Sequence, residues 1–380
     1  MEGRNKKMEL LGNAPIPKAL LAMGLPTMIG MMINALYNLV DAYFVGGLGT
    51  SQMGAISVAF PLGQVVVGLG LLFGNGGASY ISRLLGRGDR ETADRAASTA
   101  LYSSIFVGAA VILCAVIFLK PLLKCLGATD SILPYAVTYA GIYVVSSIFN
   151  VFNVTMNNIV TSEGAARTTM CVLLTGAAFN MVLDPVFIYV LKLGVAGAAI
   201  ATAISQAVST LIYLYYVISG RSMFSFRFRN CCFSNEIMSE ILKIGIPTLA
   251  FQLLTSLSIT MINMQAKPYG DSVIAGMGAV TRMISLGSLM VFGFYTVYSS
   301  LFLALGKAGE GFVLGACRQG ICFVPIILVF PALWGLNGIL YAQPAADVLS
   351  AMTALFMAVH LNRDIGKKGK GDFGMNSGIR

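Results

Sequence analysis

The sequence predicts an all-α polytopic membrane protein, a two-lobe helix bundle with about ten transmembrane helices, six in the first lobe and four in the second. Three observations predict this class. Of the 380 residues, 57% are hydrophobic and 11% are charged, whereas a soluble domain carries about 25% charged residues. Apolar stretches long enough to cross roughly 30 Å of hydrocarbon recur along the chain. Basic residues gather between alternate stretches, as expected when loops alternate between the two sides of a membrane.

The apolar stretches place the spans along the chain, with turns near Gly49 and Leu193 closing two of the hairpins. Segment 82–98 is polar and predicts a helix on the cytoplasmic surface between the second and third spans. We expect an N-lobe at 1–218, a cytoplasmic linker at 219–242, a shortened C-lobe at 243–361 and a cytoplasmic tail at 362–380. The expected spans are 16–45, 51–82, 97–119, 131–161, 168–191, 195–218, 243–267, 273–305, 312–334 and 336–361.

The formal charge of +9 reads as membrane orientation rather than as a nucleic-acid surface. The connections expected on the outer side carry few basic residues. Those expected inside carry many, which places both termini in the cytoplasm and the chain in the cell membrane. No nucleophile–base pair or metal cluster is evident, so we expect neither an enzyme nor a cofactor. The inner basic residues are Arg4, Lys6, Lys7, Arg83, Arg87, Arg90, Arg95, Arg221, Arg227, Arg229, Lys367, Lys368 and Lys370.

An internal repeat supports the two-lobe division. MGLPT at 23–27 recurs as IGIPT at 244–248, and GVAGAAIATAISQAVS at 194–209 recurs as GLNGILYAQPAADVLS at 335–350. Parallel repeats are common in secondary transporters, whose substrate site lies between the halves. By the same alignment the second lobe lacks about 80 residues of the first, which leaves one hybrid span in the C-lobe.

Two acids lie inside apolar stretches and have no basic neighbour in sequence. Asp41 lies in INALYNLVDAYFVGG and Asp184 in GAAFNMVLDPVFIYVL. A charge near the bilayer centre costs from about 2.5 to over 10 kcal/mol, so such residues usually mark an ion or substrate path. At about 1.5 Å per helical residue, Asp41, Asp184 and Thr202 lie at similar depth below the outer side, which permits them to meet.

Helical spacing adds polar neighbours to these acids. Asn180 shares a face with Asp184, and a stripe on the fourth span consists of Asn150, Asn153 and Asn157. For an asparagine the alternative is an interhelical hydrogen bond, worth about 0.6–2 kcal/mol, and that alternative stays open. A further stripe on the first span consists of Asn34, Tyr37, Asn38 and Asp41.

Pro185 follows Asp184 directly and removes the amide that would bond the carbonyl of Met181. A freed carbonyl beside a carboxylate and Asn180 supplies oxygen ligands of the kind that hard cations prefer. We therefore expect a Na⁺ or H⁺ site. Pro26 is either a plain kink or a hinge.

Three further features carry expectations. Arg282 is a basic residue inside a span, and it either lacks its partner or lies near the outer interface. Asp347 aligns with Gln206 in the repeat, which predicts a third buried acid. The glycines between 68 and 77 predict close helix packing.

Several segments resemble the MATE (multidrug and toxic compound extrusion) transporters, especially the DinF-like branch. They are GLPTMIGMMINALYNLVDAYFVGGLG, FNMVLDPVFIYVLKLGVAGAAIATAISQ, GIPTLAFQLL and MINMQAKPYGDSVIAGMGAVTRM. The match covers nearly the whole chain. The C-lobe gap departs from the family, because it removes helices that members use to line the cavity.

The resemblance implies a cation-coupled antiporter that exports cationic or amphiphilic drugs. It is expected to be a monomer among membrane lipids with no nucleic-acid partner. The coupling cation, Na⁺ or H⁺, is expected at Asp41, Asn180, Asp184, Thr202 and Asn157. The alternatives are a lipid-linked substrate flippase and a non-transporting truncated remnant. The substrate cavity and hinge are expected at Pro26, Asn34, Tyr37, Asn38, Asn153, Pro185 and Gln206.

Overall fold

The structure, a computed structural model, describes residues 16–226, 231, 234–283, 317–350, 352–353 and 356. Regular secondary structure in these ranges is entirely helical. The ranges fall into two compact units, one within residues 1–286 and one within residues 287–380. Seven helices among the described residues are long and apolar enough to cross a membrane. The expected class, an all-α polytopic membrane protein, is confirmed.

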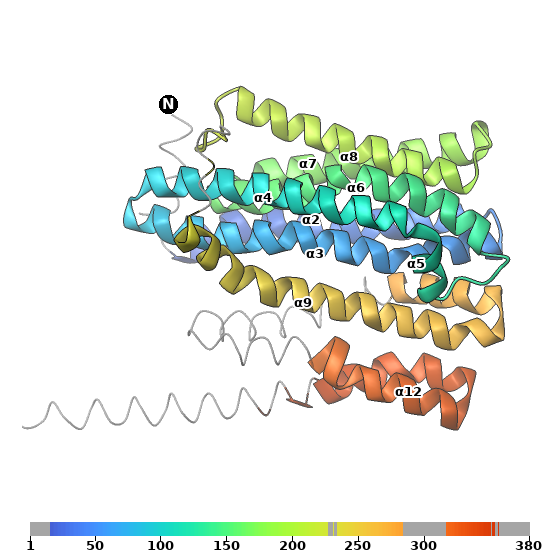
Figure 1. Cartoon of the computed structure of the whole chain (residues 1–380). Helices are drawn as coiled ribbons and strands as arrows, with labels where there is room; N and C mark the ends of the chain where they lie inside the picture. Colours follow the sequence, from blue (N-terminus) through green and yellow to red (C-terminus); the bar gives the residue numbers. More distant parts are fainter. Residues whose placement is uncertain are drawn as a thin grey trace, which may run out of the picture. The chain divides into compact units, whose positions relative to one another are not determined.

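The first unit is a bundle of long helices that lie side by side (Figure 1). A short helix α5, a π-helix η1 and a 3₁₀-helix η3 interrupt the connections, and a further helix runs over 271–283. The elements are α2 (Ile16–Gly46), α3 (Thr50–Arg87), α4 (Arg90–Ile117), α5 (Leu119–Cys125), α6 (Leu133–Ser162), α7 (Ala166–Pro185), η1 (Val186–Val190), α8 (Val195–Ile218), α9 (Asn235–Ala266) and η3 (Lys267–Tyr269).

The polar segment 82–98 is helical on both sides of a turn at Gly88 and Asp89, where it forms the end of α3 and the start of α4. α3 continues to Arg87, and Gly88 ends it in the left-handed region at φ +81°. The carboxylate of Asp89 then accepts a hydrogen bond from the backbone N–H of Thr92 at 3.0 Å and caps α4. A glycine after one helix and an aspartate before the next favour this tight reversal. The segment is a hairpin between two membrane helices.

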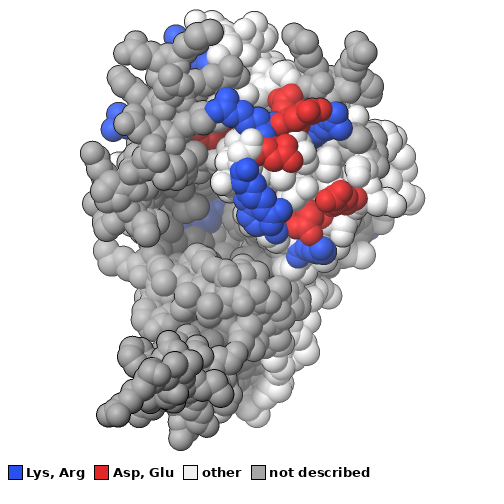
Figure 2. All heavy atoms as spheres, turned by 90° about the vertical axis from the view of Figure 1, so that its left-hand side faces the viewer, with Lys and Arg blue, Asp and Glu red and all other residues white. Residues whose placement is uncertain are grey.

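α9 begins at Asn235 rather than near residue 243. Ser234 caps its first turn, accepting from the Glu236 N–H at 3.3 Å. Glu240 then pairs with Arg83 of α3 at 2.9 Å and with Lys243 at 2.5 Å. These polar contacts extend the helix beyond its apolar part. Figure 2 shows charged side chains of both signs gathered at this end of the bundle.

The glycines of α3 allow neighbouring helices to approach closely, as predicted. A Cβ at Gly70 would lie 2.8 Å from Val154 Cβ on α6. A Cβ at Gly76 would lie 2.2 Å from the backbone oxygen of Ile241 on α9. Close backbone contact of this kind is a principal source of helix association in lipid. This close packing holds α3 in place, and α3 forms one wall of the cavity described below.

The second unit contains η4 (Cys317–Ile321), α12 (Phe323–Trp334) and a helix over 336–350. Gly335, at φ +55°, makes the turn between the last two, where the sequence predicted a span boundary. Asp347 is partly exposed and accepts a hydrogen bond from Gln343 at 3.2 Å, so the prediction of a third buried acid is wrong.

Residues 284–316 and most of the chain after 350 lie outside the described ranges. The expected spans 273–305, 312–334 and 336–361 are therefore described only in part, and the tail at 362–380 is not described. The bounds of the two lobes, the 219–242 linker and the C-lobe gap stay predictions.

Candidate ion and substrate site

A cavity of about 440 Å³ lies between α2, α3, α6, α7 and α8. Its volume is within the range of small-molecule sites, roughly 300–1,000 Å³. The residues that line it, all within the described ranges, include no Asp, Glu, Lys or Arg. Side-chain amides dominate the polar part of the wall. They belong to Asn34, Asn38, Gln64, Asn150, Asn153, Asn157, Asn158, Asn180 and Gln206.

The predicted polar stripe of α2 faces this region. Asn34, Tyr37 and Asn38 line the cavity, and Asn38 Nδ2 donates to the backbone oxygen of Asn34 at 2.8 Å and to its Oδ1 at 3.2 Å. One turn further, Asp41 lies beside a smaller pocket of about 60 Å³ that Tyr37, Asn38 and Thr202 also line. The stripe therefore connects the large cavity to an acid.

Asp184 is fully buried on α7 and belongs to a small polar group at the cavity wall. Asn180 Nδ2 donates to Asp184 Oδ1 at 3.2 Å and contacts Thr202 Oγ1 on α8 at 3.4 Å. Asp184 Oδ2 and Asn180 Oδ1 are buried and have no hydrogen-bond partner among the described residues. Unpartnered buried oxygens are costly, and their presence beside a carboxylate suits a small cation.

The backbone changes form directly after this acid. α7 ends at Pro185, and the chain continues as the π-helix η1 over Val186–Val190. Proline cannot supply the amide for an α-helical bond to Met181, and a wider helical turn accommodates that loss. Single π-turns are common at functional sites. Pro185 thus sets the helix geometry next to Asp184 and does not itself line the cavity.

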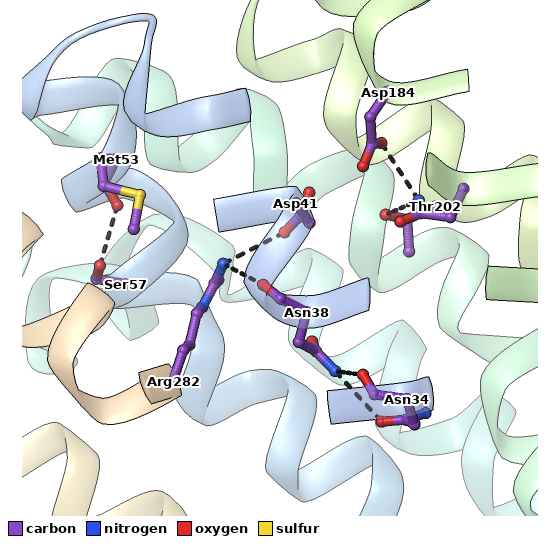
Figure 3. A network of polar contacts seen from close by, with 9 residues as sticks. Asn34, Asn38, Asp41, Met53, Ser57, Asp184, Thr202 and Arg282 are labelled. Atoms are coloured by element: carbon purple, nitrogen blue, oxygen red, sulfur yellow. Dashed lines mark hydrogen bonds and ion pairs between the residues drawn. The ribbon is translucent and has the colours of Figure 1, made fainter. Parts of the chain in front are cut away.

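Asp41 has no basic neighbour in sequence, but it has a cationic partner from a distant part of the chain. Arg282 Nη1, on helix 271–283, lies 3.3 Å from Asp41 Oδ2. The same nitrogen is 3.5 Å from the backbone oxygen of Asn38, and the guanidinium lies 5.5 Å above the Phe60 ring. Both charged residues are 7% exposed. Figure 3 shows Arg282 next to Asp41 of α2, with Asp184 and Thr202 on neighbouring helices.

Asn153 and Gln206 have a structural role in holding α6 to α8. Asn153 Nδ2 donates to the backbone oxygen of Gln206 at 2.9 Å and to its Oε1 at 2.8 Å. Thr210 Oγ1 donates to Asn153 Oδ1 at 3.0 Å. For this asparagine the interhelical hydrogen bond that the sequence left open is present. Both side chains also line the cavity.

The structure brings most of the predicted site residues together. Asn157 lines the cavity with Asn34, Tyr37, Asn38, Asn153, Asn180, Thr202 and Gln206. Pro26 is buried in α2 and does not line either pocket. Sequence reasoning missed the cavity residues Phe60, Gln64, Tyr143 and Asn158.

The sequence marks Arg282 as a basic residue inside a span, but it does not indicate which residue pairs with it. The prediction that it lacks a partner is wrong, because it pairs with Asp41. Its charge within an apolar stretch was the available signal.

Comparison with known proteins finds a family profile and relatives that match much of this chain. The profile of the MatE family matches residues 26–186, which include both Asp41 and Asp184. The multidrug export protein MepA of Staphylococcus aureus strain MRSA252 is 26% identical over 440 aligned positions, covering 95% of this chain and 97% of that protein. MepA of strain MSSA476 is 29% identical over 327 positions, covering 86% of this chain and 72% of that protein. The chain is thus similar to the MATE transporters, over residues 26–186 in the family profile and over most of its length in these relatives.

Solved MATE structures have the same fold. An inward-facing multidrug resistance MATE transporter of the MOP superfamily matches with a TM-score of 0.82 at 23% identity, covering 92% of this chain and 99% of that one. A MATE in complex with MaL6 matches with a TM-score of 0.75 at 24% identity, covering 95% and 99% of the two chains. At these identities the likeness establishes the MATE fold. Assignment to the DinF-like branch stays a prediction.

Proposed function

We propose that this protein is a transporter of the MATE type, an antiporter of the cell membrane that exports small cationic or amphiphilic organic molecules in exchange for Na⁺ or H⁺. One observation carries the proposal. A fully buried acid, Asp184, is joined through Asn180 to the wall of an uncharged, amide-lined cavity. A buried carboxylate is expensive in a membrane protein and usually serves ion or proton movement.

The coupling ion would bind at Asp184 with help from its two polar neighbours. A proton would neutralise the carboxylate directly. Na⁺ would draw on the carboxylate, on the carboxamide oxygen of Asn180 and on the hydroxyl of Thr202, which are hard oxygen ligands. The unpartnered Asp184 Oδ2 and Asn180 Oδ1 support this assignment. Asn157 lines the same cavity, and we include it as the last member of the proposed ion-binding group.

Ion and solute would be coupled because they share Asn180. Its amide nitrogen contacts both Asp184 and Thr202, and its side chain lines the cavity. A cation that recruits the Asn180 oxygen must reorient this amide and change the cavity wall. A ligand can shift a conformational equilibrium only through such a difference in contacts. Exchange of the two ligands follows from their competition for one side chain.

The lining defines the chemistry of the solute. Side-chain amides offer hydrogen bonds, while Tyr37, Phe60 and Tyr143 supply aromatic surface. Aromatic faces attract organic cations, and the charge of Asp184 behind the wall adds to that attraction. A lipid-linked phosphate would need basic groups, which the described cavity lining does not contain. The flippase alternative therefore receives no support from the cavity.

The charged end of the bundle is proposed to face the cytoplasm. Arg83, Arg87, Arg90 and Arg95 lie at or near the α3–α4 hairpin on this end, which is the distribution that cytoplasmic loops show. Both termini are then cytoplasmic. We also propose that the protein works as a monomer surrounded by lipid.

Export from proteoliposomes under an imposed Na⁺ or H⁺ gradient tests the proposal. Ethidium movement should follow the gradient in the parent protein, and Asp184→Asn should abolish the response. Asp130→Asn is the matched control, because Asp130 is an exposed acid in a loop. Gradient-dependent export that survives Asp184→Asn would contradict the proposal. A correctly inserted parent that moves no dye would support the remnant alternative.

A further inference from the structure

Arg282 occupies the place where a mobile cation would neutralise Asp41. The two residues are 241 positions apart, and their charged atoms are 3.3 Å apart in a buried environment. Arg282 lies on helix 271–283, whereas Asp41 belongs to the α2 stripe that leads to the cavity. The contact therefore joins a helix of the predicted C-lobe to the ion-binding region of the predicted N-lobe.

The charge of Arg282 is permanent, since a guanidinium does not lose its proton in proteins. A buried guanidinium must be compensated, because a buried charge left without its partner is strongly destabilising. Asp41 Oδ2, the Asn38 carbonyl and the Phe60 ring provide that compensation here. Asp41 Oδ1 is buried without a partner among the described residues. Half of the carboxylate is thus engaged and half is available.

The two acids consequently have different surroundings. Asp41 faces Arg282 from helix 271–283, Tyr139 and Tyr143 from α6, and Tyr37 from its own helix. Asp184 hydrogen-bonds to the uncharged Asn180, which also contacts Thr202, and Asp41 is the charged group that acts on it electrostatically. The pair Asp41–Arg282 is neutral as a unit, so the negative charge of the site is concentrated at Asp184.

We propose that Arg282 is a tethered competitor for the coupling cation at Asp41. This inference rests on the proposed function and assigns separate roles to the two acids. In this structure, the ion pair with Arg282 prevents a cation from binding at Asp41, so the incoming ion binds at Asp184. When a cation neutralises Asp41, the ion pair is lost and helix 271–283 is released from α2. Arg282 is a positioning residue that links ion binding to the placement of that helix.

Thermodynamic linkage determines whether removing Arg282 raises or lowers the affinity of Asp41 for the coupling cation. Because Arg282 and a mobile cation compete for one carboxylate, removal of the guanidinium must strengthen cation binding at Asp41. A neighbouring opposite charge changes the proton affinity of a carboxylate by about 10- to 1000-fold. The half-saturating concentration of the coupling ion at Asp41 should therefore fall at least about tenfold in Arg282→Gln.

The test uses the full chain in detergent with Asp184→Asn in place, so that Asp41 is the remaining acid of the pair. Ion binding is followed as the shift in melting temperature during a Na⁺ titration at fixed pH and during a pH titration. Asp184→Asn alone should respond weakly. Asp184→Asn with Arg282→Gln should regain a saturable response at a concentration at least about tenfold lower. Adding Asp41→Asn should remove that response again.

Two matched variants separate charge from structure. Arg282→Lys keeps the positive charge and should behave like Asp184→Asn alone. Arg83→Gln removes an arginine from the surface pair with Glu240 and should leave the titration unchanged. Arg282→Met replaces Arg282→Gln if the latter does not give a monodisperse helical protein. An unchanged half-saturating concentration without the guanidinium, or an equal shift in Arg282→Lys, overturns the inference.

The outcome is distinguishable from failure of the proposed function. If the parent shows the ion-dependent melting shift but no gradient-driven export, antiport is wrong and the role of Arg282 still stands. If export follows the gradient while Arg282→Gln leaves ion binding unchanged, antiport stands and the role of Arg282 is wrong.

Discussion

Asp184 on α7 and Thr202 on α8 are joined through one side chain, because Asn180 Nδ2 contacts the carboxylate at 3.2 Å and the hydroxyl at 3.4 Å. The bridge has a direct consequence for ion binding. It keeps two oxygen ligands from different helices close together, namely the carboxylate of Asp184 and the hydroxyl of Thr202. It also presents the third oxygen, Asn180 Oδ1, without a hydrogen-bond partner among the described residues.

Asn180→Leu should weaken binding of the coupling ion without removing any charge. The substitution deletes one oxygen ligand and leaves Asp184 without its amide donor, so we expect at least about a tenfold higher half-saturating concentration. Ion-dependent melting shifts of the purified protein measure this. Asn158→Leu is the matched control, because Asn158 also lines the cavity and its amide bonds Val154 on its own helix. Equal effects of the two variants would contradict the role given to Asn180.

Asn153→Leu should lower stability by removing the contact between α6 and α8. Several hydrogen bonds meet at this side chain, and interhelical bonds in membranes contribute about 0.6–2 kcal/mol each. We expect a loss of about 1–2 kcal/mol, measured by denaturant titration in mixed micelles. Thr138→Ala removes a hydroxyl that bonds Pro134 within the same helix and should change stability little. A loss in Thr138→Ala as large as that in Asn153→Leu would contradict the interpretation.

Gly76→Ala should separate α3 from α9. The added Cβ would lie 2.2 Å from the backbone oxygen of Ile241, and a backbone atom cannot rotate away. Overpacking of this kind costs about 1–3 kcal/mol. Gly86→Ala on the same helix meets nothing within 4 Å and should be neutral or slightly stabilising. A melting temperature for Gly76→Ala equal to or above that of Gly86→Ala would count against this close contact.

Asp271, at the start of helix 271–283, should make the stability of the folded protein fall as the pH becomes acidic. Partial burial raises the pKa of its carboxyl, but hydrogen bonds from the hydroxyls of Ser131, Thr129 and Ser51 outweigh burial and hold that pKa below its ordinary value. Because the folded pKa is depressed, the contribution is fully present above the unfolded pKa of about 3.9 and is lost as pH falls through the folded value.

Asp271→Asn should therefore melt at a lower temperature than the parent near neutral pH, and the difference should shrink in acid. Melting temperatures across the acid range measure the effect. Asp130→Asn, which changes an exposed acid in the loop that carries Thr129 and Ser131, should follow the parent throughout. A constant difference between Asp271→Asn and the parent at all pH values would mean that the carboxylate charge is not responsible.

Local patterns predicted much of this structure because their physical causes act within a few residues. The apolar stretch at 195–218 coincides with α8, and the spacing of Asn180 and Asp184 placed them on one face of α7. Capping was harder to anticipate. Asp89 and Gly88 turn the polar segment 82–98 into a hairpin, and Ser234 with the ion pairs of Glu240 extends α9.

The Asp41–Arg282 pair could not be predicted from local sequence. Each residue has an apolar neighbourhood, and 241 positions separate them. Their contact depends on how helix 271–283 packs against α2, which no short-range pattern determines. The exposure of Asp347 is a similar case, since its burial depends on which neighbours cover that helix.

The most direct test of antiport at this site is solute-driven ion movement. In an antiporter, a gradient of exported solute must drive the coupling ion in the opposite direction. Proteoliposomes loaded with Na⁺ or with a pH-sensitive dye, and then given an inward or outward ethidium gradient, report this flux. We predict that ethidium moves the ion in the parent and in Asp130→Asn but not in Asp184→Asn. Ion movement of equal size in Asp184→Asn, or ethidium movement without ion movement in the parent, would contradict the account.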